Sequence, residues 1–141
     1  MDYLESFAIS GAGMRVERTR VEVAALNLAN AHTVQSAGQP AFVPRRVIAS
    51  AGNFADLVGE GLEAVPLPVV TVEATGTPAR LVHEPGHPLA DARGFVAYPG
   101  VDPAGEMVQL MGATRAYEAN VAALNTARTL ALKTLEIGRG A

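Results

Sequence analysis

The residues with the clearest chemical potential lie at 83–87, where the chain reads His-Glu-Pro-Gly-His. Two histidines four positions apart, with a glutamate after the first, form the H-E-x-x-H pattern that holds zinc in metallopeptidases. That chemistry requires a helix, because a helix turns both imidazoles to one face. Pro85 and Gly86 fill the two middle positions and oppose a helix, and no histidine or glutamate follows at helical spacing as a third ligand. The string therefore predicts a turn between two extended segments.

Other routes to catalysis or ligand binding are also disfavoured. The chain has no cysteine, which excludes a disulfide, a thiolate nucleophile and a cysteine-ligated metal. The G-x-G at 11–13 lies inside a helical pattern with no strand before it, so it does not predict a phosphate loop. A net charge of −3 argues against a nucleic-acid partner. We expect no catalytic residue, no metal, no cofactor and no small-molecule substrate.

The distribution of proline divides the chain into three parts. All nine prolines lie between Pro40 and Pro103, so both ends are free of the strongest helix breaker. With 141 residues, 49% of them hydrophobic, the chain can bury one core. We predict an α+β fold with two long terminal helices packed as an antiparallel coiled-coil hairpin. The expected division is an N-terminal helix in 1–33, a small β-rich or irregular insert in 34–101, and a C-terminal helix in 102–141.

The first helix is predicted to start at Asp2, which can cap it together with Glu5, and to fade near Asn30. Apolar residues recur along it at every seventh position: Phe7, Met14, Val21 and Leu28. A seven-residue apolar repeat is typical of a helix that packs against another helix.

The second helix has a sharper predicted start, since Asp102 can cap it and Pro103 suits the first helical position. Gly138 is the expected stop. At ~1.5 Å per residue such a helix is about 52 Å long, several times the average globular helix. Its spacing of four and three selects Leu110, Tyr117, Val121, Leu124 and Leu135. The length indicates burial against neighbouring copies or partners.

Four asparagines lie within these apolar helices. For Asn27 and Asn120, which lie beside the apolar positions, we favour a role in fixing helix register. The alternative is that the amides point to solvent and that Asn30 ends its helix.

Several strings resemble the bacterial flagellar rod and hook axial proteins. They include Ile-Ser-Gly-Ala-Gly-Met at 9–14 and Asn-Leu-Ala-Asn-Ala-His-Thr at 27–33. Glu-Pro-Gly-His-Pro-Leu at 84–89, Arg-Ala-Tyr-Glu-Ala-Asn-Val at 115–121 and the ending at 131–139 narrow the resemblance to the short proximal-rod members of that family. Residues 34–79 match poorly. Pro44 intrudes before Arg45 and Arg46, which predicts an edge or a loop rather than a paired strand.

The resemblance implies a structural subunit of the flagellar basal-body rod. Such a protein polymerises through its terminal helices into the torque-transmitting shaft for motility. Its implied partners are copies of itself, other proximal and distal rod subunits, and the protein that joins the rod to the export gate. The implied location is the periplasmic rod, reached through type III export without a cleaved signal peptide. The acidic start of the chain and the lack of an apolar run of about 20 residues agree with no signal peptide and no membrane insertion.

The assembly contacts are expected along both helices. The residues that we select for them are Phe7, Met14, Val21, Asn27, Leu28, Asn30, Leu110, Tyr117, Asn120, Val121, Leu124 and Leu135. Two other functions stay open at this point. A soluble coiled-coil adaptor, or export-associated module, would remain a fixed small oligomer. A zinc hydrolase built on His83, Glu84 and His87 would bind zinc stoichiometrically.

Overall fold

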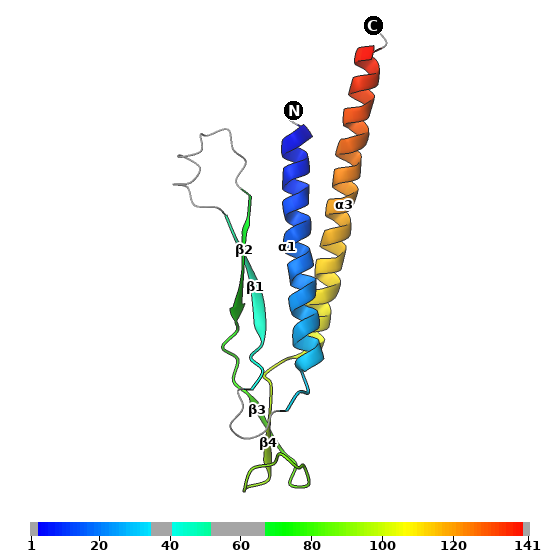
Figure 1. The fold of residues 1–141 in the computed structure, drawn as a ribbon. Helices are drawn as coiled ribbons and strands as arrows, with labels where there is room; N and C mark the ends of the chain where they lie inside the picture. Colours follow the sequence, from blue (N-terminus) through cyan, green and yellow to red (C-terminus); the bar gives the residue numbers. More distant parts are fainter. Residues whose placement is uncertain (1–2, 35–40, 52–66, 140–141) are drawn as a thin grey trace. The chain divides into compact units, whose positions relative to one another are not determined.

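The computed structural model describes residues 3–34, 41–51 and 67–139 of the chain. Two long helices, α1 (Tyr3–Asn30) and α3 (Pro103–Arg139), enclose a β region in the chain order (Figure 1). That region holds β1 (Arg45–Ser50), β2 (Val69–Ala74), β3 (Arg80–His83) and β4 (Phe95–Tyr98). The predicted order of helix, small β region and helix is confirmed. The proposed Asp2 cap and the parts of the insert at 35–40 and 52–66 lie outside the described residues.

The chain forms two compact units, and each contains a piece of both helices. The first unit combines Met1–Thr19, Ile48–Thr71 and Gly112–Ala141. The second unit combines Arg20–Val47 and Val72–Met111. Residues far apart in the sequence therefore meet inside each unit.

The ends of the helices follow from local chemistry. The Asp102 carboxylate accepts the backbone N–H of Ala104 at 3.1 Å, and its carbonyl accepts the N–H of Glu106 at 3.0 Å. This cap, with Pro103 as the first helical residue, confirms the predicted start of α3. At the end of α1, the Asn30 side chain donates to the Leu26 carbonyl at 2.8 Å. Asn30 thus ends its helix, whereas α3 continues one residue beyond Gly138 to Arg139.

The β region consists of two two-stranded sheets, β1 with β2 and β3 with β4. Just outside the first sheet, the Thr75 N–H donates to the Pro44 carbonyl at 2.8 Å. Since Pro44 precedes β1 and Thr75 follows β2, these strands are antiparallel. Pro44 stays outside the strand and contributes only its carbonyl, because proline has no N–H to donate to a ladder. The following Arg45 and Arg46 are paired in β1, which is an edge strand because its sheet has two strands. The prediction of an edge is therefore correct, and the prediction that this stretch is unpaired is wrong for the two arginines.

The second sheet is an antiparallel hairpin with Arg80 opposite Tyr98 and His83 opposite Phe95. Between its strands, Pro85 and Gly86 form a turn, as predicted, and no helix carries the two histidines. Gly94 takes a φ of 79°, a conformation that favours glycine. Val96 in β4 is among the most buried side chains, 1% exposed.

The buried core of the described residues is small and made mostly of small side chains. It includes Ala12, Val16, Ala24, Ala31 and Ala113. Many large apolar side chains instead lie exposed on the helices and strands. Exposed apolar surface often marks an interaction site, so the helix surfaces are the candidate sites of this chain.

Candidate assembly surface

The apolar repeat of α1 is only half-buried in the chain itself. Phe7, Met14, Val21 and Leu28 all keep part of their surface accessible. A second series at seven-residue spacing is more deeply buried: Ser10, Glu17 and Ala24 in α1 and Ala31 directly after it, each at most 9% exposed. The innermost face of α1 therefore carries small and polar residues, while the large apolar ones border it and remain available for contact.

In the first unit, α1 and α3 approach closely at Gly13. A Cβ atom on Gly13 would lie 2.6 Å from Oδ1 and 2.9 Å from Cγ of Asn120. Asn120 is held in place because its Nδ2 donates to the Ala116 carbonyl at 2.9 Å. The missing side chain of Gly13 thus makes room for the Asn120 amide, a packing role that accounts for a glycine within a helix.

A groove of ≈ 450 Å³ also lies between the helices in the first unit. Ser6, Ile9 and Ser10 line it from α1. The residues from α3 are Ala123, Thr126, Ala127 and Leu130. Its lining is mainly apolar and small, and Ile9 and Leu130 are about half exposed. Short side chains let another backbone approach, so the groove has the character of a helix-accepting surface.

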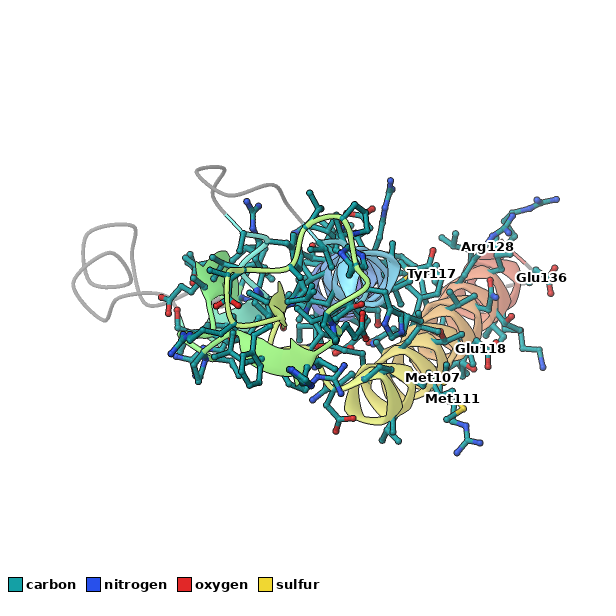
Figure 2. All side chains as sticks on the ribbon, turned by 90° about the horizontal axis from the view of Figure 1, so that it is seen from below. Met107, Met111, Tyr117, Glu118, Arg128 and Glu136 are labelled. Carbon is teal, nitrogen blue, oxygen red and sulfur yellow. The ribbon has the colours of Figure 1, made fainter. Side chains whose placement is uncertain are left out.

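The predicted residues of α3 separate into two groups. Leu110, Val121 and Leu124 are half-buried, whereas Tyr117 and Leu135 are exposed, Leu135 by 67%. Tyr117 is labelled on α3 in Figure 2.

Sequence reasoning missed further exposed apolar residues of α3. In the first unit they are Leu130, Leu132 and Ile137. In the second unit they are Met107, Val108 and Met111, of which the two methionines are labelled in Figure 2. They do not lie at the spacing of four and three that we used to select apolar residues. The sequence signal for them is the density of apolar residues in 107–111 and 130–137, which is too high for one face of the helix to hold them all.

In the second unit, Asn27 joins three segments. Its Nδ2 donates to the Arg45 carbonyl at 2.7 Å and to Oε1 of Glu106 at 2.9 Å, and its Oδ1 accepts the Arg45 N–H at 3.0 Å. Asn27 is 1% exposed, so these bonds satisfy an amide that would be costly to bury alone. The structure gives Asn27 a role inside the chain, holding α1 to β1 and to α3.

The hairpin around the two histidines is stabilised by its own side chains. The Asp91 carboxylate accepts the backbone N–H groups of Arg93 and Phe95, each at 2.8 Å. The bond from Phe95 is the main reason that the pKa of Asp91 lies below its ordinary value. The Tyr98 hydroxyl donates to Glu84 at 3.0 Å, which raises the pKa of Tyr98.

The histidines of the string make structural contacts. The His83 ring packs on Phe95 with centroids 5.0 Å apart, and His87 Nδ1 accepts the Leu89 N–H at 3.1 Å. Within the described ranges no three His, Cys, Asp or Glu side chains converge on a point that could hold a metal ion. Over the same ranges neither helix is apolar enough for long enough to cross a bilayer.

Comparison with known proteins identifies the family of this chain. Residues 92–137 match the family described as flagellar basal body rod FlgEFG protein, C-terminal. The chain is 41% identical to the flagellar basal-body rod protein FlgC of Escherichia coli, over 99% of this chain and 100% of the relative. The chain belongs to the FlgC family of flagellar basal-body rod proteins. FlgC of Salmonella typhimurium is also 41% identical, and FlgC of Bacillus subtilis is 33% identical, each over 99% of this chain and 100% of the relative.

As a member of the FlgC family, the chain is a structural subunit of the rod in the flagellar basal body, where it serves motility. The resemblance to rod proteins is thereby confirmed. The family match at 92–137 covers β4 and most of α3, including Tyr117, Asn120, Val121, Leu124 and Leu135. The exposed apolar residues of the helices therefore belong to a structural subunit of the rod.

Proposed function

We propose that this chain polymerises through its terminal helices into the proximal rod and transmits torque there without any catalytic activity. In this proposal α1 and α3 pair as an antiparallel coiled-coil hairpin. Residues 34–101, between the predicted helical segments 1–33 and 102–141, form a separate small insert. The observation that carries the proposal is the apolar groove of the first unit, which leaves Ile9 and Leu130 about half exposed.

The groove suits a helix from a neighbouring subunit. Two helices with a shallow channel between them accept a third helix when the channel residues are small, because helix axes then approach to about 8–10 Å. Ser10, Ala123 and Ala127 provide this small lining, and Ile9 and Leu130 provide apolar flanks. Covering those flanks removes apolar surface from water at roughly 25 cal/mol per Å².

The contact residues in this proposal are those with accessible apolar surface. On α1 they are Phe7, Met14, Val21 and Leu28, and on α3 they are Leu110, Tyr117, Val121, Leu124 and Leu135. Of the three asparagines, Asn27 and Asn120 contribute by holding the helices in the geometry that neighbours meet, and Asn30 contributes at the end of α1. Many such contacts spread along two helices suit a shaft under torque better than one patch.

The partners are copies of this chain and the other rod components, including proximal and distal subunits and the protein at the junction with the export gate. The relatives are named as basal-body rod proteins, which supports this assembly. Delivery through the flagellar type III apparatus without signal cleavage belongs to the same proposal.

The test fills the groove in the flagellated source bacterium. Ala127→Phe places a large ring in the groove, and Ala119→Phe is the matched control because Ala119 lies on the same helix, exposed and outside the groove. We expect A127F to reduce the number of completed rods and swimming, since overpacking costs about 1–3 kcal/mol at each repeated contact. A119F should retain both. Normal rods in A127F would refute the role of the groove in assembly. A wild-type chain that remains a fixed small oligomer would instead favour a soluble adaptor.

A further inference from the structure

A cleft in the second unit gathers positive charge on an otherwise acidic protein. It encloses ≈ 230 Å³ and is lined by Arg20, Arg45 and Arg46 together with one carboxylate, Glu106. The whole chain has only 11 Lys and Arg against 14 Asp and Glu. Three arginines lining one cleft are therefore a concentration that the composition alone does not predict.

The cleft is held in shape from within the unit. Arg45 is fixed at its backbone because its N–H and carbonyl both bond to Asn27. The same asparagine donates to Oε1 of Glu106, and this bond uses part of the hydrogen-bonding capacity of the Glu106 carboxylate. Arg46 pairs with Glu73 at 3.7 Å, but both side chains are more than half exposed, so this pair is weak.

The wall and floor favour binding of an acidic group. Ala24, 3% exposed, and Val23 give the cleft an apolar side next to the arginines. Guanidinium forks bind carboxylates through paired, charge-assisted hydrogen bonds, and these strengthen where water is partly excluded. A carboxylate is therefore the group that this cleft fits.

We propose that the arginine cleft, defined by Arg20, Arg45 and Arg46, binds a glutamate side chain from a helix of a second copy of the chain. The inference rests on the proposed polymerisation and names one of its contacts. Three exposed helix glutamates have no bond or ion pair within the part of the chain that the structure describes. They are Glu5, Glu118 and Glu136, and the latter two are labelled on α3 in Figure 2.

All three glutamates belong to the first unit, whereas the cleft belongs to the second. A contact between unlike surfaces of two copies is heterologous, and a heterologous contact that does not close into a ring continues as an open filament. A rod needs a contact of this kind. The acidic residues of the hairpin are less suitable, because Asp91 and Glu84 already bond within it.

The first experiment reverses the charge in the source bacterium and then restores complementarity. Arg45→Glu should lower the number of completed rods per cell by at least about tenfold, the change that follows from losing one charge-assisted contact. Arg93→Glu, on an exposed arginine of the same unit outside the cleft, is the matched control and should leave the count unchanged. Combining R45E with Glu5→Arg, Glu118→Arg or Glu136→Arg should restore the count to within about twofold for one of the three.

Two results would overturn the proposal: rods that form normally with R45E, or an R45E defect that none of the three reversals repairs. An equal defect in R93E would also overturn it, since the loss would then reflect net charge alone.

A second measurement separates this contact from the rod role. The chain has no cysteine, so single cysteines can be cross-linked without background. Gln109→Cys at the cleft, mixed with a copy carrying a cysteine beside the glutamate that restores assembly, should give a bismaleimide-linked dimer that R45E abolishes. A dimer in a chain that forms no rods would keep the contact and remove the proposed function. Rods without that dimer would overturn the contact and keep the function.

Discussion

Replacing Gly13 by alanine should destabilise the packing of α1 on α3, whereas the same replacement at Gly11 should stabilise α1. Both glycines lie within one helix and two positions apart, so they share the same intrinsic cost in helix propensity. They differ in what a methyl group would meet. Among the residues that the structure describes, and apart from its own stretch of helix backbone, no atom lies within 4 Å of a Cβ built on Gly11, while one on Gly13 would lie 2.6 Å from Oδ1 of Asn120.

The magnitudes follow from these surroundings. Gly11→Ala gains about 0.5–1 kcal/mol because alanine restricts the unfolded chain and suits a helix. Gly13→Ala gains the same amount, but the Asn120 amide must move. That movement costs roughly 1–3 kcal/mol for overpacking and about 1 kcal/mol for the hydrogen bond to Ala116. The net change for G13A is therefore destabilising by about 1–3 kcal/mol.

Thermal unfolding of the full chain, followed by circular dichroism at 222 nm, measures both variants. A change of ~1 kcal/mol shifts the midpoint by roughly 3–5 °C in a protein of this size. The double variant G13A with Asn120→Ala should recover most of the loss, since it removes the obstructing amide. Equal midpoints for G11A and G13A would refute the close approach of the helices at Gly13.

Three further outcomes are expected. Asn27→Ala should lower the free energy of unfolding in urea by about 2–3 kcal/mol, because it leaves the β1 backbone and an α3 carboxylate without their buried partner; a loss under 0.5 kcal/mol would contradict this. Gly94→Ala should destabilise the hairpin by about 1–3 kcal/mol, since φ is +79° and Pro85 lies 3.0 Å from the new Cβ. Gly86→Ala should be near neutral, because no described atom lies within 4 Å of its new Cβ. Equal shifts of the thermal midpoint for G94A and G86A, followed by circular dichroism, would refute this reasoning. Finally, because the pKa of Asp91 is lowered in the folded chain, its ionised carboxylate stabilises the fold at pH values above 3.8, the ordinary pKa of the group. This contribution should be lost as the pH falls through the folded pKa, and an NMR titration that gives Asp91 a pKa of 3.8 or more would contradict it.

The parts of the fold that depend on neighbouring residues follow directly from the sequence. Asp102 and Pro103 determine the start of α3, and Pro85 with Gly86 determines the hairpin turn, because caps and turns need only local contacts. Asn30 belongs to the same class, since it bonds within four residues of itself.

The parts that depend on distant residues do not. Asn27 bonds to partners 18 and 79 positions away, which no local pattern of asparagine reveals. The deepest face of α1 was missed because hydrophobic spacing selects large side chains, whereas close helix packing selects small ones such as Ser10 and Ala24. The arginine cleft was missed for the same reason as Asn27, since α1 and β1 each supply part of it.

The most direct test of the polymerisation is a cryo-electron microscopy map of basal bodies purified from the source bacterium. We predict that copies of this chain in the rod place a helix of a neighbouring subunit in the groove between Ile9 and Leu130. A rod in which that groove faces solvent in every copy, with neighbours joined only through the β region, would contradict assembly through the terminal helices.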